Sequence, residues 1–449
     1  MRILLVPAIL LFAFLAYWVP ERSQPHDSRI HLTYWEKWTG FEGDAMRAVV
    51  DAFNRSQDKI TVDMLTVSQV DQKLLLATAG GVPPDVAGLW SYNVNVFADK
   101  GALLPLDDYM RGAGYGPSYY LPVYWKVVDY RGHVWAVPST PATTALHWNR
   151  TLFREAGLDP DRPPRTIEEL DRYADRLTKR DAKGNLIQAG FMHSEPGWWN
   201  WAWGYFFGGK LWDGKSKITA ASPENIRAFK WVQSYAKKYG TSQLQVFKSG
   251  FGSFSSPQNA FLSRPPRVAM VLQGVWMHNF IHKYSPTTDW AAAPFPYPAD
   301  RPDLANTTVA EEDVLVIPRG SKHPDEAFEF LKYANSQKGM ELLCLGHRKN
   351  SPLTHVSADF YRKHENPYIR VFGDLARSPN AFGTPQIGIW TEYRDELNSA
   401  FDNIWLMKKT PEQALKEVQV RMQAKLDREL ARRKYREGDA AVALGGTRP

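Results

Sequence analysis

Large aromatic rings are the first residues of this 449-residue chain that could do chemistry. Seventeen tryptophans are an unusual number, and four of them stand in the stretch HSEPGWWNWAWGYFFGG, residues 193–209. Rings gathered this densely can fill a core, lie in a membrane interface or stack on a ligand. Because Asn200 and the flanking glycines interrupt a run already too short to span a bilayer, we expect a core or a ligand site.

Carboxylates are the second group of residues with chemistry to offer. Several stand beside aromatic residues or in a run, namely Glu36, Glu195, Glu311, Glu312 and Asp313. A glycoside hydrolase would use two such groups as acid and base, whereas a sugar-binding site would use them to hold hydroxyl groups. Two hypotheses therefore stay open: a binding protein, and a secreted carbohydrate-active hydrolase with Glu195 or Glu311 as its acid.

Other kinds of chemistry have no matching motif. The sequence has no GxGxxG, HExxH or GxSxG pattern, and its eleven histidines form no cluster typical of a metal site. The one cysteine, Cys344, lies in the apolar run MELLCLG, which excludes a disulfide framework and a Cys-based zinc site. We therefore expect no cofactor and no metal.

The net charge of +7 is unevenly distributed along the chain. Residues 421–438 (RMQAKLDRELARRKYREG) include seven basic and three acidic residues, so this segment alone contributes +4. A solvated helix face explains such a pattern better than a nucleic-acid groove does. We expect no nucleic-acid partner.

The N-terminus has the form of an export signal. After Arg2 the apolar run ILLVPAILLFAFLAYWVP ends in a Tyr-Trp pair typical of a membrane interface, and the polar segment ERSQPHDSR follows. Phe14 stands where a cleavage site needs a small residue, and the run is near the minimum length for a membrane span. We therefore predict that residues 1–28 are an uncleaved anchor to the inner membrane, favoured over a cleaved signal, and that the working domain is periplasmic or extracytoplasmic.

The elements that must position these residues begin at His31. The run IHLTYW predicts a strand, GDAMRAVVDAFNRS has helical spacing, KITVDMLTV alternates like a strand, and DVAGLW predicts a third strand after another helix. This alternation is typical of parallel βαβ units in an α/β fold. Ligands of such sheets lie beyond the carboxyl ends of the strands, where this chain has Trp35, Glu36, Trp38, Trp90, Tyr92 and Asn93.

The rest of the chain continues the α/β pattern and then becomes helical. Thr166 and Glu169 form a capping pair at the start of one predicted helix, and Thr410 and Gln413 form another at the start of the last. Strands are predicted at RVAMVLQ and EDVLVIP. Residues 437–449 are predicted to be a disordered tail.

Several stretches, in order, resemble the bacterial extracellular solute-binding proteins of the maltose-binding type, which are sugar-binding subunits of ABC importers. They are AGGVPPDVAGLW with FADKGALLPLDDY, GHVWAVPSTPATTALHWNRTLFREAGLDPDRPPRTIEEL, RVAMVLQGVW, VLVIPRGSKHPDEAFEFLKYANS, and TPQIGIW with TPEQALKEVQ. The resemblance covers nearly the whole chain after about His31.

The resemblance implies a two-lobed periplasmic-binding-protein fold of type II-like form. Each lobe is a sheet flanked by helices, and crossing strands form a hinge between the lobes. On this basis the N-lobe and recrossing region comprise residues 29–145 and about 310–350. The C-lobe comprises residues 146–309 and about 351–436.

The resemblance also implies a ligand site. Trp90 and Trp276 match stacking rings, Trp390 matches another, and Asn93 stands where the maltose binder has a carboxylate. The pair Glu195-Pro196 matches a Glu-Pro pair followed by an aromatic residue, which here must be Trp198 or Trp199 because Gly197 intervenes.

Further contacts are expected from Glu311 and Glu312, where the chain recrosses between the lobes, and from Arg348. Two departures argue against maltose itself. Ala142 stands where the maltose binder has a hinge-side carboxylate, and Trp35 to Trp38 replace an Asp-Lys pair.

These features predict an exported monomer that captures a mono- or oligosaccharide between two lobes and delivers it to the permease subunits of an ABC importer, without catalysis. A micromolar complex needs about 8 kcal/mol, and stacking two or three rings at roughly 2 to 3 kcal/mol each, with charge-assisted hydrogen bonds, reaches that range. Besides the hydrolase, a binder of a non-sugar solute such as a polyol phosphate or a polyamine remains an alternative.

Overall fold

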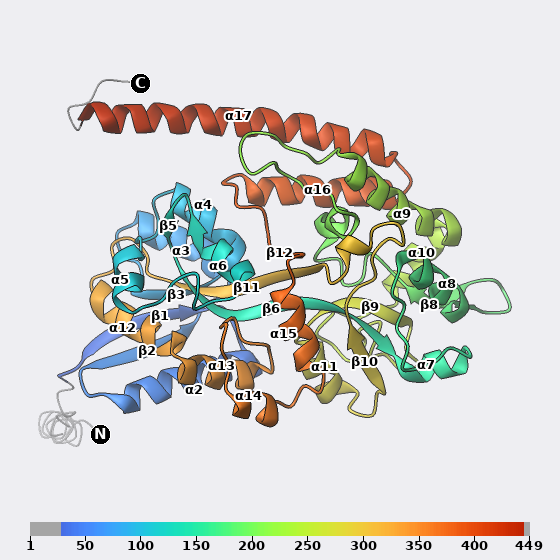
Figure 1. The fold of residues 1–449 in the computed structure, drawn as a ribbon, viewed down its shortest axis with the longest axis horizontal. Helices are drawn as coiled ribbons and strands as arrows, with labels where there is room; N and C mark the ends of the chain where they lie inside the picture. The colour runs from blue at the N-terminus through green and yellow to red at the C-terminus, as the bar shows by residue number, and fades with distance from the viewer. Residues whose placement is uncertain (1–27, 444–449) are drawn as a thin grey trace, which may run out of the picture.

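The computed structural model describes residues 28–443 (Figure 1). The predicted signal or anchor, residues 1–28, lies outside this range except for its last residue. Within residues 28–443 no helix is both long enough and apolar enough to cross a membrane. Residues 437–443 of the predicted tail continue the last helix, and the remainder of the tail also lies outside the described residues.

The fold is mixed α/β, as predicted, with one curled sheet in the order β2-β1-β3-β11-β6-β9-β8-β7; β10 pairs with β6 and β12 with β11. Its strands are β1 (Ile30–Glu36), β2 (Ile60–Thr66), β3 (Val86–Trp90), β6 (Val137–Asn149), β7 (Lys179–Arg180), β8 (Leu186–Phe191), β9 (Val268–Gly274), β10 (Trp290–Ala293), β11 (Thr308–Val316) and β12 (Ala381–Phe382). Strands β4 (Asp129–Tyr130) and β5 (His133–Val134) form a separate hairpin.

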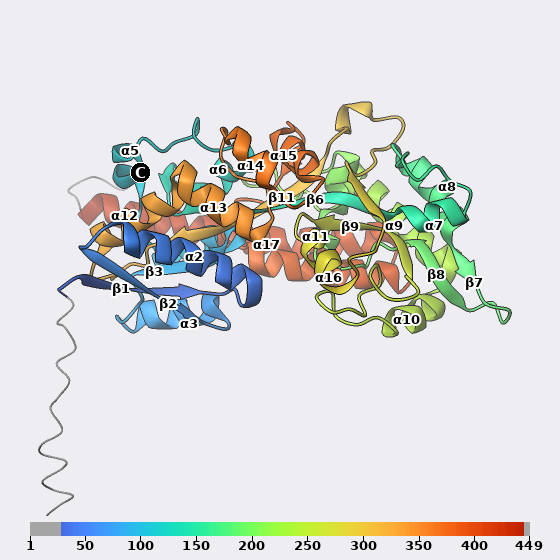
Figure 2. The same ribbon diagram turned by 90° about the horizontal axis from the view of Figure 1, so that it is seen from below.

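The sheet has two halves that share β6 and β11. Strand β1 is parallel to β2 and β3, which confirms the βαβ prediction, and β11 runs antiparallel to both β3 and β6. We call β1 to β3 and their helices the N-half, and β7 to β10 and their helices the C-half. Figure 2 shows the two halves side by side with β6 and β11 running between them.

Helices cover both halves. On the N-half lie α2 (Gly40–Ser56), α3 (Val70–Ala79), α4 (Val94–Asp99), α5 (Asp107–Gly112), α6 (Pro122–Val128), α12 (Pro324–Asn335), α13 (Gln337–His347) and α14 (Ala358–Lys363). On the C-half lie α7 (Arg150–Glu155), α8 (Ile167–Leu177), α9 (Pro223–Tyr239), α10 (Thr241–Ser249), α11 (Met277–Tyr284) and α16 (Trp390–Trp405). Helix α15 (Ile369–Arg377) packs against β6 and β11, and short 3-10 turns occur at η1 (Ser91–Asn93), η2 (Asn200–Phe207) and η3 (Pro302–Leu304).

Local sequence explains why these elements form. Strand β1 alternates, so Leu32, Tyr34 and Glu36 are buried on one face. The predicted caps are present: Thr166 Oγ1 accepts from the backbone N–H of Glu169 at 3.2 Å. Such a cap satisfies a helix N–H that has no partner within the helix.

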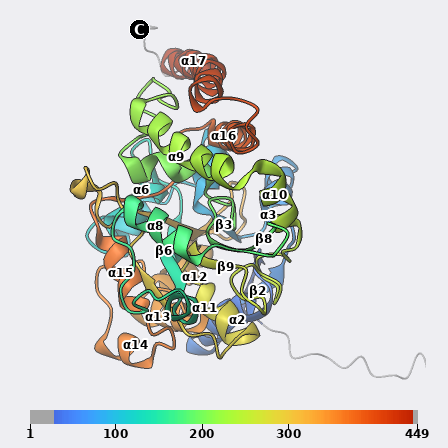
Figure 3. The same ribbon diagram turned by 90° about the vertical axis from the view of Figure 1, so that its right-hand side faces the viewer.

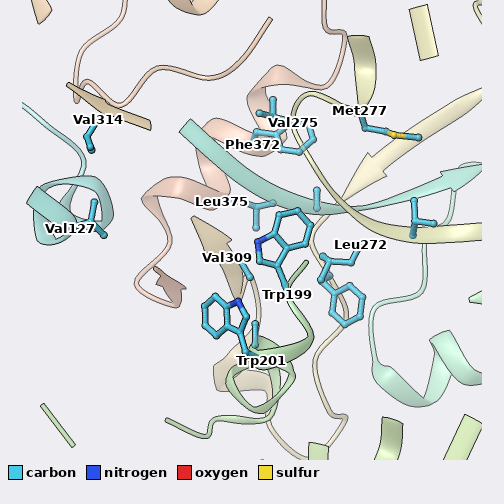
Figure 4. Packing of buried hydrophobic residues seen from close by; sticks show 14 of the residues in the cluster. Val127, Trp199, Trp201, Leu272, Val275, Met277, Val309, Val314, Phe372 and Leu375 are labelled. Carbon is cyan, nitrogen blue, oxygen red and sulfur yellow. The ribbon is translucent and has the colours of Figure 1, made fainter. Parts of the chain in front are cut away.

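The tryptophan-rich stretch 193–209 divides at Trp199. Beyond it the chain forms η2, whose Trp201, Trp203, Phe206 and Phe207 are buried in the core of the C-half. Figure 4 shows Trp199 and Trp201 among the buried apolar side chains, with Val309 beside them. Much of this stretch is therefore core, and only its front is left for a ligand.

The last helix, α17 (Pro411–Ala443), is unusually long. Its first half packs on α16 and α9 through buried Ala414, Leu415, Val418, Met422 and Leu426. Its second half continues past the C-half and runs above the N-half (Figure 1), and Figure 3, which looks nearly along this helix, shows it at the edge of the molecule beyond α16. One helix of the C-half thus extends over the other half of the molecule.

Candidate ligand-binding site

Five tryptophans gather where the two halves meet, and we call them the aromatic cluster: Trp38, Trp90, Trp198, Trp199 and Trp276. In the N-half the rings of Trp38 and Trp90 meet edge to face at 6.2 Å between centroids. In the C-half Trp276 lies 5.9 Å from Trp199 and 6.0 Å from Trp198. These separations lie within the range of favourable ring pairs.

The ends of strands position these rings. Trp90 is the last residue of β3, Trp38 follows β1 by two residues, and Trp276 follows β9 by two residues. Trp199 directly precedes η2. The structure therefore brings together residues that the strand-end argument and the family resemblance selected separately.

A buried lysine links the rings of the two halves. Lys349 follows α13, and its Nζ lies 5.5 Å from the centroid of Trp38 and 5.6 Å from that of Trp276. Its side chain is only 3% exposed. Lys37 takes a similar position between Trp38 and Trp90, at 5.3 and 5.5 Å. Cations placed over ring faces in this way are attracted by the ring quadrupole.

Carboxylates neutralise both lysines. Lys349 Nζ lies 2.8 Å from Glu42 Oε1, and Lys37 Nζ lies 3.2 Å from Asp313 Oδ1. Burial alone would raise the pKa of Asp313, but the ammonium groups of Lys37 and Lys349 hold it below its usual value. With Glu36 at 3.7 Å from Lys37, three carboxylates surround two ammonium groups, so no positive charge is left over for an anionic ligand.

Two further carboxyl groups remain weakly paired. Trp199 Nε1 donates to Glu311 Oε2 at 3.3 Å, and burial raises the pKa of Glu311 to about 7. Burial likewise raises the pKa of Glu195 to about 7, although the charge of Lys248 acts in the opposite direction. Near neutral pH each group can accept hydrogen bonds when ionised and donate one when protonated.

Two other residues selected from the sequence, Glu36 and Trp35, are directed away from the cluster, and Trp198 lies at its exposed edge. Glu36 is engaged inside its own loop, accepting from Tyr34 Oη and from the backbone N–H groups of Lys37 at 2.7 Å and Trp38 at 3.1 Å. Trp35 projects from the opposite face of β1, since side chains alternate along a strand. Trp198 is 48% exposed and packs edge to face on Phe254 at 4.4 Å.

Three more selected residues lie apart from the cluster. Glu312 is buried, and neither of its carboxylate oxygens has a hydrogen-bond partner among residues 28–443. Arg348 binds Glu365 at 2.5 Å and Asn279 at 3.2 Å. Trp390 is fully buried edge to face against Trp201, at 5.0 Å.

Tyr92 and Asn93 extend the site outward. The ring of Tyr92 stacks on Trp90, at 5.8 Å with 5° between the planes, and the guanidinium of Arg394 lies 4.9 Å from its centroid. Asn93 is buried beside it. Both residues line a cavity of about 900 Å³ that opens between the halves.

Sequence reasoning missed the charged residues at the centre of the site. Lys37 stands between the selected Glu36 and Trp38, so the signal was present. Arg348 was selected from the sequence, and its neighbour Lys349 was not. Arg348 has a left-handed backbone conformation (φ 54°) that ends α13. The chain reverses there, so Arg348 faces Glu365 and Lys349 faces the aromatic cluster.

Rings from both halves of the molecule surround ion-paired lysines, an arrangement suited to non-covalent binding and not to catalysis. A family model described as bacterial extracellular solute-binding protein matches residues 41–341, and the chain belongs to that family. It is therefore an extracytoplasmic solute-binding protein of the kind that serves ABC importers, and the hydrolase alternative is wrong because the family is not enzymatic.

Known relatives bind different solutes. The sn-glycerol-3-phosphate-binding periplasmic protein UgpB of Escherichia coli K12 is 22% identical over 418 residues, which are 86% of this chain and 90% of that protein. The solved structure of CpMnBP1 with mannobiose bound is 28% identical, with a TM-score of 0.75, covering 87% of this chain and 99% of the other. A solute-binding protein of Thermotoga lettingae bound with alpha-D-tagatose is 24% identical, with a TM-score of 0.70, covering 88% of this chain and all of the other.

Proposed function

We propose that this protein captures a neutral mono- or oligosaccharide between its two halves and delivers it to the permease subunits of an ABC importer. The observation that supports this most directly is the aromatic cluster, which draws Trp38 and Trp90 from the N-half and Trp199 and Trp276 from the C-half. A sugar presents a C–H face that packs on such rings and hydroxyl groups that suit the nearby carboxyls. The structural likeness to CpMnBP1 with mannobiose bound agrees with this choice.

The charges of the site favour an uncharged ligand over a phosphate. A polyol phosphate such as the ligand named for UgpB would need free cations, yet Lys37 and Lys349 already face Asp313 and Glu42. A polyamine would need several unpaired acids, but Glu36, Glu42 and Asp313 are paired with these same lysines, and burial raises the pKa of Glu311 and of Glu195 to about 7, so that each is only partly ionised at neutral pH. A neutral glycan requires neither free cations nor unpaired acids.

The two halves act as lobes in this proposal. Residues 29–145 with about 310–350 make the N-lobe and recrossing region, and residues 146–309 with about 351–436 make the C-lobe, except that α14 packs on α13 of the N-half. Strands β6 and β11 are the crossing strands of a type II-like hinge. A ligand that contacts rings of both lobes stabilises the closed arrangement by its differential affinity. The permease would recognise that arrangement. The protein is a monomer, held at the membrane by residues 1–28.

Titration calorimetry of the purified protein tests the proposal. The panel contains mannobiose, mannotriose, tagatose, maltose and glycerol 3-phosphate. We expect at least one neutral saccharide to bind with micromolar affinity, about 8 kcal/mol, and glycerol 3-phosphate not to compete with it. Binding of glycerol 3-phosphate alone, or of no saccharide better than millimolar, would overturn the proposal.

Membrane attachment has its own test. An uncleaved anchor keeps the protein in the membrane fraction after washing with high salt, because apolar insertion does not depend on ionic strength. Release of the protein by salt, or a mature N-terminus beyond residue 18 by mass spectrometry, would show that the segment does not anchor it.

A further inference from the structure

The cavity of about 900 Å³ beside the aromatic cluster lies partly under α17. From the N-half it is lined by α3, η1 and α4, including Tyr92 and Asn93; from the C-half it is lined by Arg394 of α16 and by Lys425 and Arg432 of α17. Its volume falls within the range of about 300 to 1,000 Å³ typical of small-molecule sites.

One buried donor in this cavity has no partner. Asn93 is 5% exposed, and its Nδ2 has no hydrogen-bond acceptor in the part of the chain that the structure describes. A buried amide N–H without an acceptor destabilises a fold. A ligand oxygen within hydrogen-bond distance of Asn93 Nδ2 would supply that acceptor. Asn93 is therefore a lining residue of the cavity whose amide has an unused hydrogen-bond donor.

The cavity adjoins the aromatic cluster through Tyr92, which lines the cavity and stacks on Trp90. The ring of Tyr92 lies nearly parallel to that of Trp90, so an apolar surface extends from the cluster into the cavity. Arg394 lies over Tyr92 and adds guanidinium donors at the edge of that surface. A chain of sugar rings needs this alternation of flat apolar faces and planar polar groups.

The charges that line the cavity are balanced. Four acidic residues, Asp71, Asp99, Glu392 and Glu429, face four basic residues, Lys100, Arg394, Lys425 and Arg432. An ion pair of 2.7 Å between Lys425 and Glu392 ties α17 to α16 at this point. Such a lining offers many donors and acceptors but no net charge, which matches an uncharged polyhydroxyl ligand.

We propose that this cavity binds the further sugar units of a linear oligosaccharide whose first units occupy the aromatic cluster, and that α17 is the roof that recognises them. The inference rests on the proposed function and refines it. The ligand is a glycan longer than a disaccharide, and contacts with α17 make the affinity depend on the number of sugar units.

A chain-length series tests the inference. The affinities of manno-oligosaccharides of two to six units are measured by calorimetry for the wild-type protein and for a Lys425→Ala/Arg432→Ala variant. The matched control is Arg428→Ala, because Arg428 is an exposed cation of the same helix that does not line the cavity. We expect the double variant to weaken the longest members tenfold or more and the disaccharide less than twofold, and the control to change neither.

The outcomes separate the two proposals. If the disaccharide binds but affinity does not rise with length, or if the double variant affects all lengths equally, the role of α17 is refuted and the sugar site stands. If no member of the series and no saccharide of the calorimetric panel binds, both proposals fail. Circular dichroism melting of each variant confirms that the fold is retained.

Discussion

At the scale of single residues, sequence predicted the rings better than the charges around them. Trp90 and Trp276 were selected by motif and do lie in the aromatic cluster. Arg348 was selected and its neighbour Lys349 was not, because the direction of a side chain depends on one left-handed residue at the end of α13 that sequence spacing does not show. Buried ion pairs between distant segments, such as Lys349 with Glu42, are invisible until the chain is folded.

The neighbours Arg348 and Lys349 give a matched pair of variants. Lys349→Ala leaves the buried carboxylates of Glu42 and Asp313 without their shared cation, which we expect to lower the free energy of unfolding by about 3 to 5 kcal/mol. Arg348→Ala removes an ion pair to the exposed Glu365 and should cost about 1 kcal/mol or less. Urea denaturation measures both, and equal losses would contradict the assignment of Lys349 to the centre of the site.

Trp276 tests the aromatic cluster directly. Trp276→Ala removes a ring that contacts both Trp198 and Trp199 and should weaken any bound saccharide about tenfold or more. Trp135→Ala is the control, because Trp135 is partly buried beside His133, outside the cluster. Calorimetry with the best saccharide of the panel measures both, and an unchanged affinity for Trp276→Ala would remove this ring from the site.

Glu311 should make binding depend on pH. Its pKa is raised to about 7 by burial, and an ionised carboxylate accepts hydrogen bonds from sugar hydroxyls more strongly than the protonated acid does. A ligand that prefers the ionised form gains affinity as pH rises through the pKa. We expect about a three- to tenfold rise between pH 6 and 8. In Glu311→Gln the profile should flatten; an unchanged slope would exclude Glu311 as the cause, leaving Glu195, whose pKa is also about 7.

At the scale of elements, periodicity predicted most strands and helices because their buried faces repeat regularly. Strand β1, helix α8 and the capped start of α17 formed as expected. Within the stretch 193–209 the chain forms η2, a 3-10 turn in which nearly every ring is buried, so the rings show no single buried face that sequence periodicity could reveal. Strand β11 directs Glu311 and Asp313 to the side of the site and Glu312 to the opposite side, near Tyr124 of α6.

Glu312 destabilises β11 in a pH-dependent way. Burial, with the nearby charge of Asp313, raises its pKa well above the usual value, so the stability associated with its protonated form is present at low pH and is lost as pH rises. Glu312→Met removes an unpartnered buried carboxyl at similar volume. We expect it to increase the free energy of unfolding by about 1 to 3 kcal/mol at pH 7, with a larger gain at pH 8 than at pH 5. Glu329→Met, at an exposed position of α12, should show neither gain nor slope, and denaturation curves across this pH range measure both variants.

At the scale of the whole molecule, the mixed α/β architecture followed from the order of family-like segments, whereas the reach of α17 did not. A basic helix with mixed faces looks like a solvated surface in sequence, and only the folded chain shows that its second half passes above the N-half.

The two halves also touch at Gly388, which precedes α16, and Asp99, which ends α4: a Cβ atom at Gly388 would lie 2.0 Å from Asp99 Oδ2 and 3.2 Å from its Cγ. Because these two residues are so close, a cross-link between them can test whether the two halves move relative to each other.

A disulfide between these positions should lock the halves together. The distances at Gly388 suit the Cβ separation of about 3.5 to 4.5 Å that a disulfide requires, and the one native cysteine, Cys344, is buried and so does not compete. If ligand enters only when the halves separate, oxidised Asp99→Cys/Gly388→Cys should bind the best saccharide at least about tenfold more slowly than its reduced form. Stopped-flow tryptophan fluorescence with and without dithiothreitol measures this, with mass spectrometry to verify the bond. Equal association rates in the two redox states would mean that the site is reached without hinge motion, and the two halves would then be one rigid binding body.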